Sequence, residues 1–123
     1  MPQPPIISIV DDDEAVRESL RGFFRSVGLT ANVFSSAEEF LAWPDLRTTH
    51  CLIVDVRMPG MNGLELQRRL AADQYPIRVI FMTAHVDEDV RARALASGAV
   101  DFLLKPFSEE ALLNAIKGCL KSK

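Results

Sequence analysis

Five side chains that could take part in polar chemistry stand where short apolar runs end. Asp55 is the most demanding of them, because it directly follows the all-apolar run 52–54. A carboxylate without partners is costly to bury, so we expect the strand to deliver Asp55 to an edge where water, a cation or a lysine meets it. The full set of side chains at such ends is Asp11, Asp12, Asp55, Thr83 and Lys105.

The three acidic side chains of this set predict a metal site. Carboxylates gathered at one edge would repel one another unless a hard divalent cation joined them, and oxygen ligands with open positions suit Mg²⁺. We therefore expect Asp11, Asp12 and Asp55 to bind Mg²⁺, with Mn²⁺ as a substitute. A carboxylate beside such a cation, with a lysine and a hydroxyl converging on it, is equipped to accept a phosphoryl group. Asp55 is the predicted nucleophile, supported by Lys105 and Thr83.

Apolar runs alternate with stretches of helical periodicity along the whole chain. Asp13 and Glu14 are expected at the N-terminus of the first helix, where negative charge is favourable. This alternation predicts an α/β fold: a flavodoxin-like, doubly wound, five-stranded parallel sheet of order 2-1-3-4-5, flanked by five helices. Ligands of such sheets bind at the carboxyl ends of the strands, between strands one and three. The expected strands cover residues 6–10, 30–34, 52–54, 77–82 and 99–104.

Three of the helices have distinct sequence signals. Ser36 and Glu39 fit a capping box that opens a short helix before Pro44, and Ser108 can cap the last helix. The segment 87–97 is rich in alanine but thinly apolar, so we expect a loosely held helix. Its expected buried face carries Val90, Ala94 and Leu95.

Length and composition indicate one cytoplasmic domain over residues 1–123, with 1–5 as a frayed lead-in. The net charge of −3, from 14 basic and 17 acidic residues, provides no basic surface for DNA, which would have to be bound outside this chain. We find no apolar run of the ~20 residues that span a bilayer and no secretory signal, so we expect no membrane association. Cys51 and Cys119 belong to no metal-ligating cluster and are expected to be free thiols in a reducing compartment.

The ordered set of motifs resembles the receiver domain of bacterial two-component response regulators, which has the CheY-like form of the predicted fold. The motifs are the aspartate pair after the first strand, Asp-x-x-Met-Pro-Gly-x-x-Gly at 55–63, Thr83-Ala84 and Lys105-Pro106. The resemblance covers the chain from about residue 6 to residue 120. The stretch 55–59 is further similar to receivers of the FixJ/NarL type, which normally precede a helix-turn-helix output domain.

The resemblance implies a role for each matching residue at the phosphorylation site. Asp55 would receive a phosphoryl group from a sensor histidine kinase. Asp12 would bind Mg²⁺ directly and Asp11 mainly through water, with the backbone carbonyl of Arg57 as a further ligand. Lys105 would pair with a phosphoryl oxygen, aimed inward by a cis peptide bond to the proline that follows.

The resemblance also implies a switch. Thr83 would move to bind the phosphate, Ala84 would leave room for it and offer its N–H, and Phe102 would swing inward. An ordinary strand aromatic that never moves is the alternative for Phe102. Arg57 and His85 would border the path of a hydrolytic water and tune the lifetime of the phosphate. His85 has the alternative of a solvent-facing loop imidazole, and His50 is expected to be structural.

The fourth helix and fifth strand are the expected switched surface, used for phosphorylation-dependent homodimerisation or for release of a transcriptional output domain. Its residues would be Val90, Arg91, Phe102 and Leu103. The kinase is expected to dock on the first helix, around residues 15–17, and on the loop 106–107, by family resemblance.

Two rival functions remain at this point. A haloacid-dehalogenase-type phosphatase would use Asp11-x-Asp13, but it leaves Asp55 unexplained and would need a cap that the chain lacks. A stand-alone or degenerate receiver would act as a protein-interaction module and would take up no phosphate from acetyl phosphate. On the preferred interpretation the chain is not a conventional enzyme, since it catalyses only its own phosphorylation and dephosphorylation at Asp55.

Overall fold

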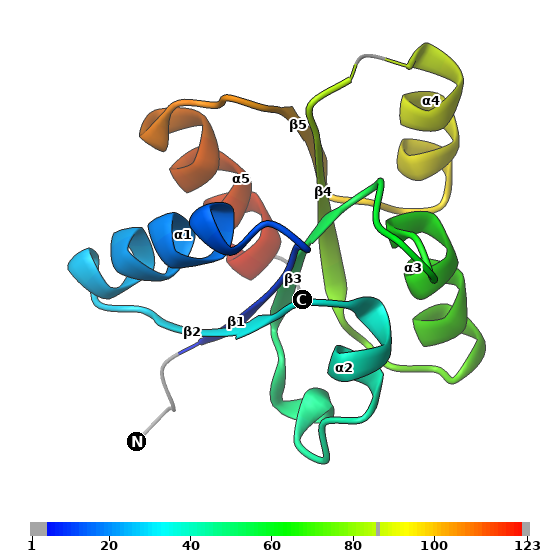
Figure 1. Cartoon of the computed structure of the whole chain (residues 1–123), viewed down its shortest axis with the longest axis horizontal. Coiled ribbons are helices and arrows are strands. Elements are labelled where there is room, and N and C mark those ends of the chain that lie inside the picture. Colours follow the sequence, from blue (N-terminus) through cyan, green and yellow to red (C-terminus); the bar gives the residue numbers. More distant parts are fainter. Residues whose placement is uncertain (1–4, 86, 122–123) are drawn as a thin grey trace.

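The computed structural model describes residues 5–85 and 87–121. Residues 1–4, which make up most of the expected lead-in 1–5, lie outside the described residues. Five strands form one parallel sheet of order β2-β1-β3-β4-β5, and five α-helices flank it (Figure 1). The predicted fold class and strand order are confirmed. The elements are β1 (Ile6–Val10), α1 (Glu14–Ser26), β2 (Thr30–Phe34), α2 (Ala37–Leu41), the 3₁₀ helix η1 (Leu46–Thr48), β3 (Cys51–Asp55), α3 (Gly63–Ala72), β4 (Arg78–Thr83), α4 (Glu88–Ala96), β5 (Asp101–Leu104) and α5 (Glu109–Lys121).

Alternate residues of the central strands enter two separate cores, one on each face of the sheet. Ile53 of β3 packs in the core that contains the buried faces of α1 and α5. Its neighbours Leu52 and Val54 pack in the second core, with the buried residues of α2, α3 and α4. Figure 1 shows the same division, with α1 and α5 on one side of the sheet. A strand covered on both faces must be apolar at every position, which explains the continuous apolar run that precedes Asp55.

Local capping explains most helix starts. The Ser36 hydroxyl accepts a hydrogen bond from the N–H of Glu39, as predicted, but the Glu39 carboxylate binds the N–H of Ser35, so the expected capping box is only half formed. A complete capping box occurs instead between Asn62 and Glu65, at the start of α3. This box fixes the end of the loop that follows Asp55.

Several boundaries differ from those predicted. β4 includes Thr83, and β5 begins at Asp101 rather than at residue 99. Ala99 is not part of the strand because its N–H binds the carbonyl of Ala94 and closes the end of α4. α2 ends at Leu41, and η1, which the sequence did not suggest, follows it.

Helix α4 is as thinly packed as its composition predicts. Ala94 is its one fully buried residue in the part of the chain that the structure describes. Leu95 was expected on the buried face, but 38% of its surface is exposed, because this lightly packed helix buries little besides Ala94. α4 therefore has little apolar area to hold it in one place.

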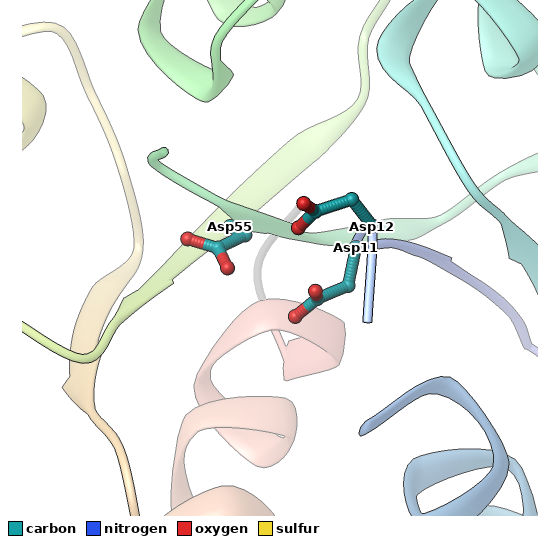
Figure 2. A group of neighbouring side chains, drawn as sticks. All are labelled: Asp11, Asp12 and Asp55. Carbon is teal, nitrogen blue, oxygen red and sulfur yellow. The ribbon is translucent and has the colours of Figure 1, made fainter. Parts of the chain in front are cut away.

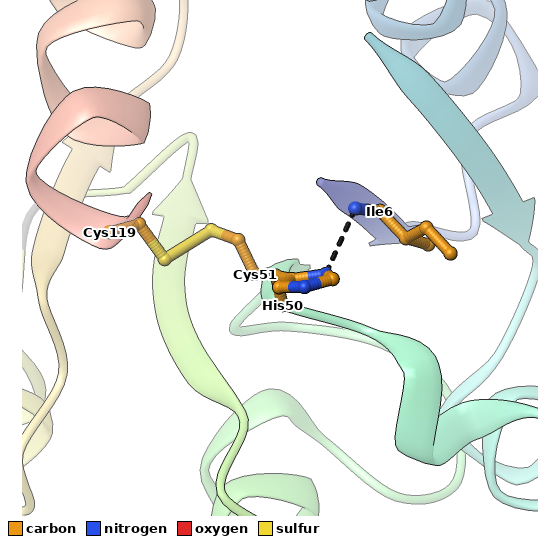
Figure 3. The surroundings of a disulfide bond; sticks show 4 residues. All are labelled: Ile6, His50, Cys51 and Cys119. Carbon is orange, nitrogen blue, oxygen red and sulfur yellow. Dashed lines mark hydrogen bonds between the residues drawn. A yellow bond between two sulfur atoms is a disulfide. The ribbon is translucent and has the colours of Figure 1, made fainter. Parts of the chain in front are cut away.

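The two cysteines are not free thiols, and that prediction is wrong: Cys51 and Cys119 form a disulfide (Figure 3). Cys51 begins β3 and Cys119 lies on the buried face of α5, so both enter the same core with their Cα atoms 6.1 Å apart. The two cysteines are 68 residues apart in the sequence, so their spacing gave no indication of this pairing. Beside it, Nδ1 of His50 accepts a hydrogen bond from the N–H of Ile6 at 3.0 Å, which confirms the structural role expected for His50.

Among the described residues, no helix has the combination of length and apolar composition that crossing a bilayer requires.

Candidate functional site

The predicted polar residues meet at the carboxyl ends of the strands. Asp55 ends β3, and Asp11 and Asp12 directly follow the neighbouring β1. Thr83 ends β4, and Lys105 directly follows β5. The sheet therefore brings together residues that are up to 94 positions apart in the chain.

The three aspartates form a cluster that could hold a metal ion. One carboxylate oxygen from each of Asp11, Asp12 and Asp55 lies within 4.8 Å of the others. Figure 2 shows the three side chains side by side at the ends of β1 and β3. Asp11 is fully buried and Asp55 is 8% exposed, whereas Asp12 faces solvent. An all-oxygen donor set with one open side fits a hard divalent cation.

Lys105 is the cation that the site itself supplies. Its Nζ donates to Oδ2 of Asp11 at 2.7 Å and to Oδ2 of Asp55 at 2.8 Å. The peptide bond between Lys105 and Pro106 is cis, as the family resemblance implied. Burial lowers the pKa of Lys105, but the hydrogen bonds to the two carboxylates outweigh this effect, so its pKa lies above the ordinary value. Lys105 is therefore fully charged near neutral pH.

Burial is also the main influence on the pKa of Asp55. Desolvation raises the pKa of its carboxyl group above the ordinary value, and the hydrogen bonds from Lys105 and from the N–H of Arg57 only partly oppose this rise. The N–H of Arg57 lies 3.0 Å from Oδ1 of Asp55, so Oδ1 is bound to the loop and Oδ2 to the lysine. In a buried carboxyl group with a raised pKa, the negative charge is incompletely stabilised, and a bound cation would stabilise it further.

The start of α3 lies directly against the end of β3. A Cβ at Gly63 would lie 2.6 Å from the backbone oxygen of Asp55 and 3.2 Å from the ring of Phe81. The N–H of Gly63 also donates to the carbonyl of Val56. Only glycine permits this approach, which gives a physical reason for the last glycine of the motif 55–63.

Thr83 borders a cavity of about 640 Å³ between the β3–α3 loop and α4. Thr83 is buried, and its Oγ1 accepts a hydrogen bond from the N–H of His85 at 3.2 Å. Phe102 lines the same cavity, and its ring is tilted against Phe81 with 6.4 Å between centroids. The cavity leaves space beside Thr83 into which an aromatic side chain could turn.

Arg57 and His85 also line this cavity and have exposed side chains. Arg57 lies 4.0 Å from the carboxylate of Asp87, which caps α4, so one ion pair bridges the opening. The sequence did not single out Asp87 as a site residue. Its only signal was its place as the first residue of the segment expected to form the fourth helix.

Comparisons with known proteins agree on one family. The chain matches the response regulator receiver domain over residues 7–117. It is 48% identical over 119 residues to the response regulator protein TmoT of Ectopseudomonas mendocina, covering 97% of this chain and 54% of TmoT. It is 40% identical over 116 residues to the transcriptional regulatory protein FixJ of Bradyrhizobium diazoefficiens, covering 94% of this chain and 56% of FixJ.

A solved structure shows the same likeness in three dimensions. The crystal structure of FixJ-N superimposes with a TM-score of 0.89 at 38% identity, covering 99% of this chain and 98% of that one. The chain spans about half the length of the curated relatives it matches. The comparisons thus concern the part of those proteins that this chain resembles.

Proposed function

Because the chain belongs to the family of response regulator receiver domains, we propose that it accepts a phosphoryl group on Asp55 from a phosphohistidine of a sensor histidine kinase. The main support for the proposal is that Asp55 lies beside the carboxylates of Asp11 and Asp12 and the ammonium group of Lys105. These groups meet at the carboxyl ends of β1 and β3, where such sheets bind their ligands. In this arrangement Asp55 can react while Asp11 and Asp12 hold a metal ion beside it and Lys105 supplies a further positive charge.

The proposed metal is Mg²⁺, with Mn²⁺ as a substitute. Asp11, Asp12 and Asp55 would hold it, together with the backbone carbonyl of Arg57. When bound, the cation supplies positive charge that neutralises the phosphoryl oxygens and the carboxylates. The fit rests on the donor set alone, which consists of oxygen atoms within 4.8 Å of one another.

The transfer itself would use the side chains of this chain. An oxygen of Asp55 attacks phosphorus in line, a P–O bond forms, and the P–N bond to the kinase histidine breaks with its electron pair left on the imidazole. Lys105, which lies 2.8 Å from Asp55, would move with the new phosphoryl group and pair with one of its oxygens. The N–H of Ala84 and the hydroxyl of Thr83 would bind others.

We infer that the signal leaves through α4 and β5. Binding of the phosphate by Thr83 would release its hydrogen bond to His85 and draw the start of α4 toward the site. Phe102 would then turn into the cavity beside Thr83. Since α4 is thinly packed, a small shift in local free energy could move it. The surface around Val90, Arg91 and Leu103 would then support homodimerisation or release an output domain.

The roles of Arg57 and His85 in phosphate lifetime are part of the same proposal. Both line the cavity that Thr83 borders, so both could admit water to that side of the site or exclude it. The kinase would dock on α1 around residues 15–17 and on Phe107, where Val16 and Phe107 line a groove beside Lys105.

DNA would be reached only through an output domain outside this chain. The net charge of −3 gives the chain no attraction for a polyanion. The relative FixJ is named a transcriptional regulatory protein, and the chain covers 56% of it. We therefore propose transcription as the output that this domain controls.

One experiment tests the proposal as a whole. The protein is incubated with acetyl phosphate and Mg²⁺, and its intact mass and its size-exclusion profile are measured. We expect a gain of one phosphate and a shift toward the dimer. No gain in mass would favour a degenerate receiver, and steady turnover of a phosphomonoester would favour a phosphatase.

A further inference from the structure

The loop between β3 and α3, residues 56–62, carries the backbone carbonyl of Arg57 that would bind the metal. Close to the site the loop is held by its own neighbours: the N–H of Arg57 binds Asp55, and the N–H of Gly63 binds the carbonyl of Val56. These contacts fix the two ends of the loop. They leave the middle, around Gly60 and Met61, to be held by something else.

A glutamate from another helix holds the middle of the loop. Oε2 of Glu38, on α2, accepts a hydrogen bond from the N–H of Met61 at 3.0 Å, across 23 residues of sequence. Gly60 has a φ of +75°, and a Cβ there would lie 2.8 Å from the same Oε2. The absence of a side chain at Gly60 therefore makes room for the carboxylate. The hydrogen bond from Met61, and then that from the N–H of Glu38 itself, keeps the pKa of this carboxyl below its ordinary value.

Both ends of this contact are attached to rigid parts of the molecule. Ala37 and Phe40, on either side of Glu38 in α2, have no exposed surface, so the helix is firmly seated on the sheet. On the loop, Pro59 lies between Arg57 and Met61 and restricts the backbone, because its ring fixes φ. Gly60, which stands between Pro59 and Met61, gives the backbone freedom to move once the contact is lost, so we expect the contact at Met61 to keep the loop, and with it the carbonyl of Arg57, in one position.

We propose that Glu38 is a positioning residue for the metal site: by binding the N–H of Met61, it holds the loop that presents the carbonyl of Arg57. This inference rests on the proposed function, because it assigns that carbonyl to the bound cation. Glu38 touches neither the metal nor the phosphate in this account. Its effect is on the geometry of one ligand.

The test compares Mg²⁺ affinities by calorimetry for the protein and two variants at the same position. Glu38→Ala removes the acceptor, and we expect about two- to fivefold weaker Mg²⁺ binding, the range that suits one solvent-exposed hydrogen bond. Glu38→Gln removes the charge but keeps an oxygen acceptor for Met61, and we expect it to restore most of the affinity. Glu18→Ala, an exposed glutamate on α1, is the matched control and should bind Mg²⁺ like the unmodified protein.

A second measurement separates positioning from folding. The amide resonance of Met61 should shift in Glu38→Ala and stay near its original position in Glu38→Gln. Both variants should still unfold cooperatively, with midpoints within a few °C of the unmodified protein. Equal Mg²⁺ affinity in Glu38→Ala would overturn the inference. Equally weak binding in both variants would also overturn it, because charge rather than the tether would then be responsible. Failure of the unmodified protein to bind Mg²⁺ would instead overturn the proposed function.

Discussion

Replacing Lys105 by methionine should destabilise the metal-free protein and strengthen its binding of Mg²⁺. The Lys105 side chain is 18% exposed, and the side chains of its two partners, Asp11 and Asp55, are 0% and 11% exposed. Removing one partner of a buried ion pair costs about 3–5 kcal/mol, because the remaining charge loses its compensation. Because the Lys105 side chain keeps some exposure, water screens part of the charge left behind, and we expect a loss near the lower limit, about 3 kcal/mol at neutral pH.

The same substitution removes the positive charge that a metal ion must meet when it enters. Two unit charges about 4 Å apart near a protein surface interact by roughly 4 kcal/mol, and about 1.4 kcal/mol corresponds to tenfold, so we expect Mg²⁺ to bind at least about tenfold more tightly to Lys105→Met. Mg²⁺ should then recover part of the lost stability, since it binds only the folded protein.

Urea unfolding with and without Mg²⁺, together with calorimetric titration, measures both effects. Lys117→Met, which changes an exposed lysine on α5, is the matched control and should change neither quantity. Unchanged stability together with weaker Mg²⁺ binding in Lys105→Met would contradict this prediction. It would mean that the ammonium group does not neutralise the aspartates.

Three further predictions follow from the same geometry. Thr83→Ala should still be phosphorylated by acetyl phosphate but should lose the shift toward the dimer in size exclusion, because the hydroxyl that draws on α4 is missing; a full shift would contradict the proposed switch. In the metal-free protein the carboxyl of Asp55 should titrate above 3.8 in carbon-detected NMR, because burial raises its pKa. The folded form then binds the proton more tightly than the unfolded chain does. The contribution of Asp55 to the free energy of unfolding should therefore be greatest below pH 3.8 and decline as the pH rises through the pKa of the folded form. A titration midpoint below 3.8 would contradict this prediction. Reducing the disulfide between Cys51 and Cys119 should lower the free energy of unfolding by about 4 kcal/mol, the chain-entropy value for this loop length, and identical urea midpoints with and without dithiothreitol would exclude that contribution.

Much of the fold follows from features that the sequence displays openly. The apolar run 52–54 predicts a strand buried on both faces, and the charge that ends it marks the edge of the sheet. Because all strands of such a sheet point the same way, residues at their ends gather without any contact having to be predicted. This is why Asp11, Asp55 and Lys105 could be placed together before their distances were known.

Other features depend on side-chain geometry that residue types do not reveal. Cys51 and Cys119 meet because one faces inward from a strand and the other from a helix 68 residues later, and no spacing rule connects them. Glu38 binds a backbone N–H, so its partner has no characteristic side chain in the sequence. The capping signal favoured Glu39, which in fact binds the N–H of Ser35. Leu95 was placed on the buried face of α4 by periodicity, but that helix packs too lightly to bury it.

We propose above all that the carboxylate of Asp55 is the phosphoryl acceptor, in a pocket where Lys105 and a bound metal ion neutralise negative charge. The most direct measurement is to phosphorylate the protein with acetyl phosphate and Mg²⁺, trap the acyl phosphate by borohydride reduction, and locate the modified residue by peptide mass spectrometry. We predict modification at Asp55, none without Mg²⁺, and none in Asp55→Asn. Modification at another residue, or undiminished phosphate uptake in Asp55→Asn, would contradict it.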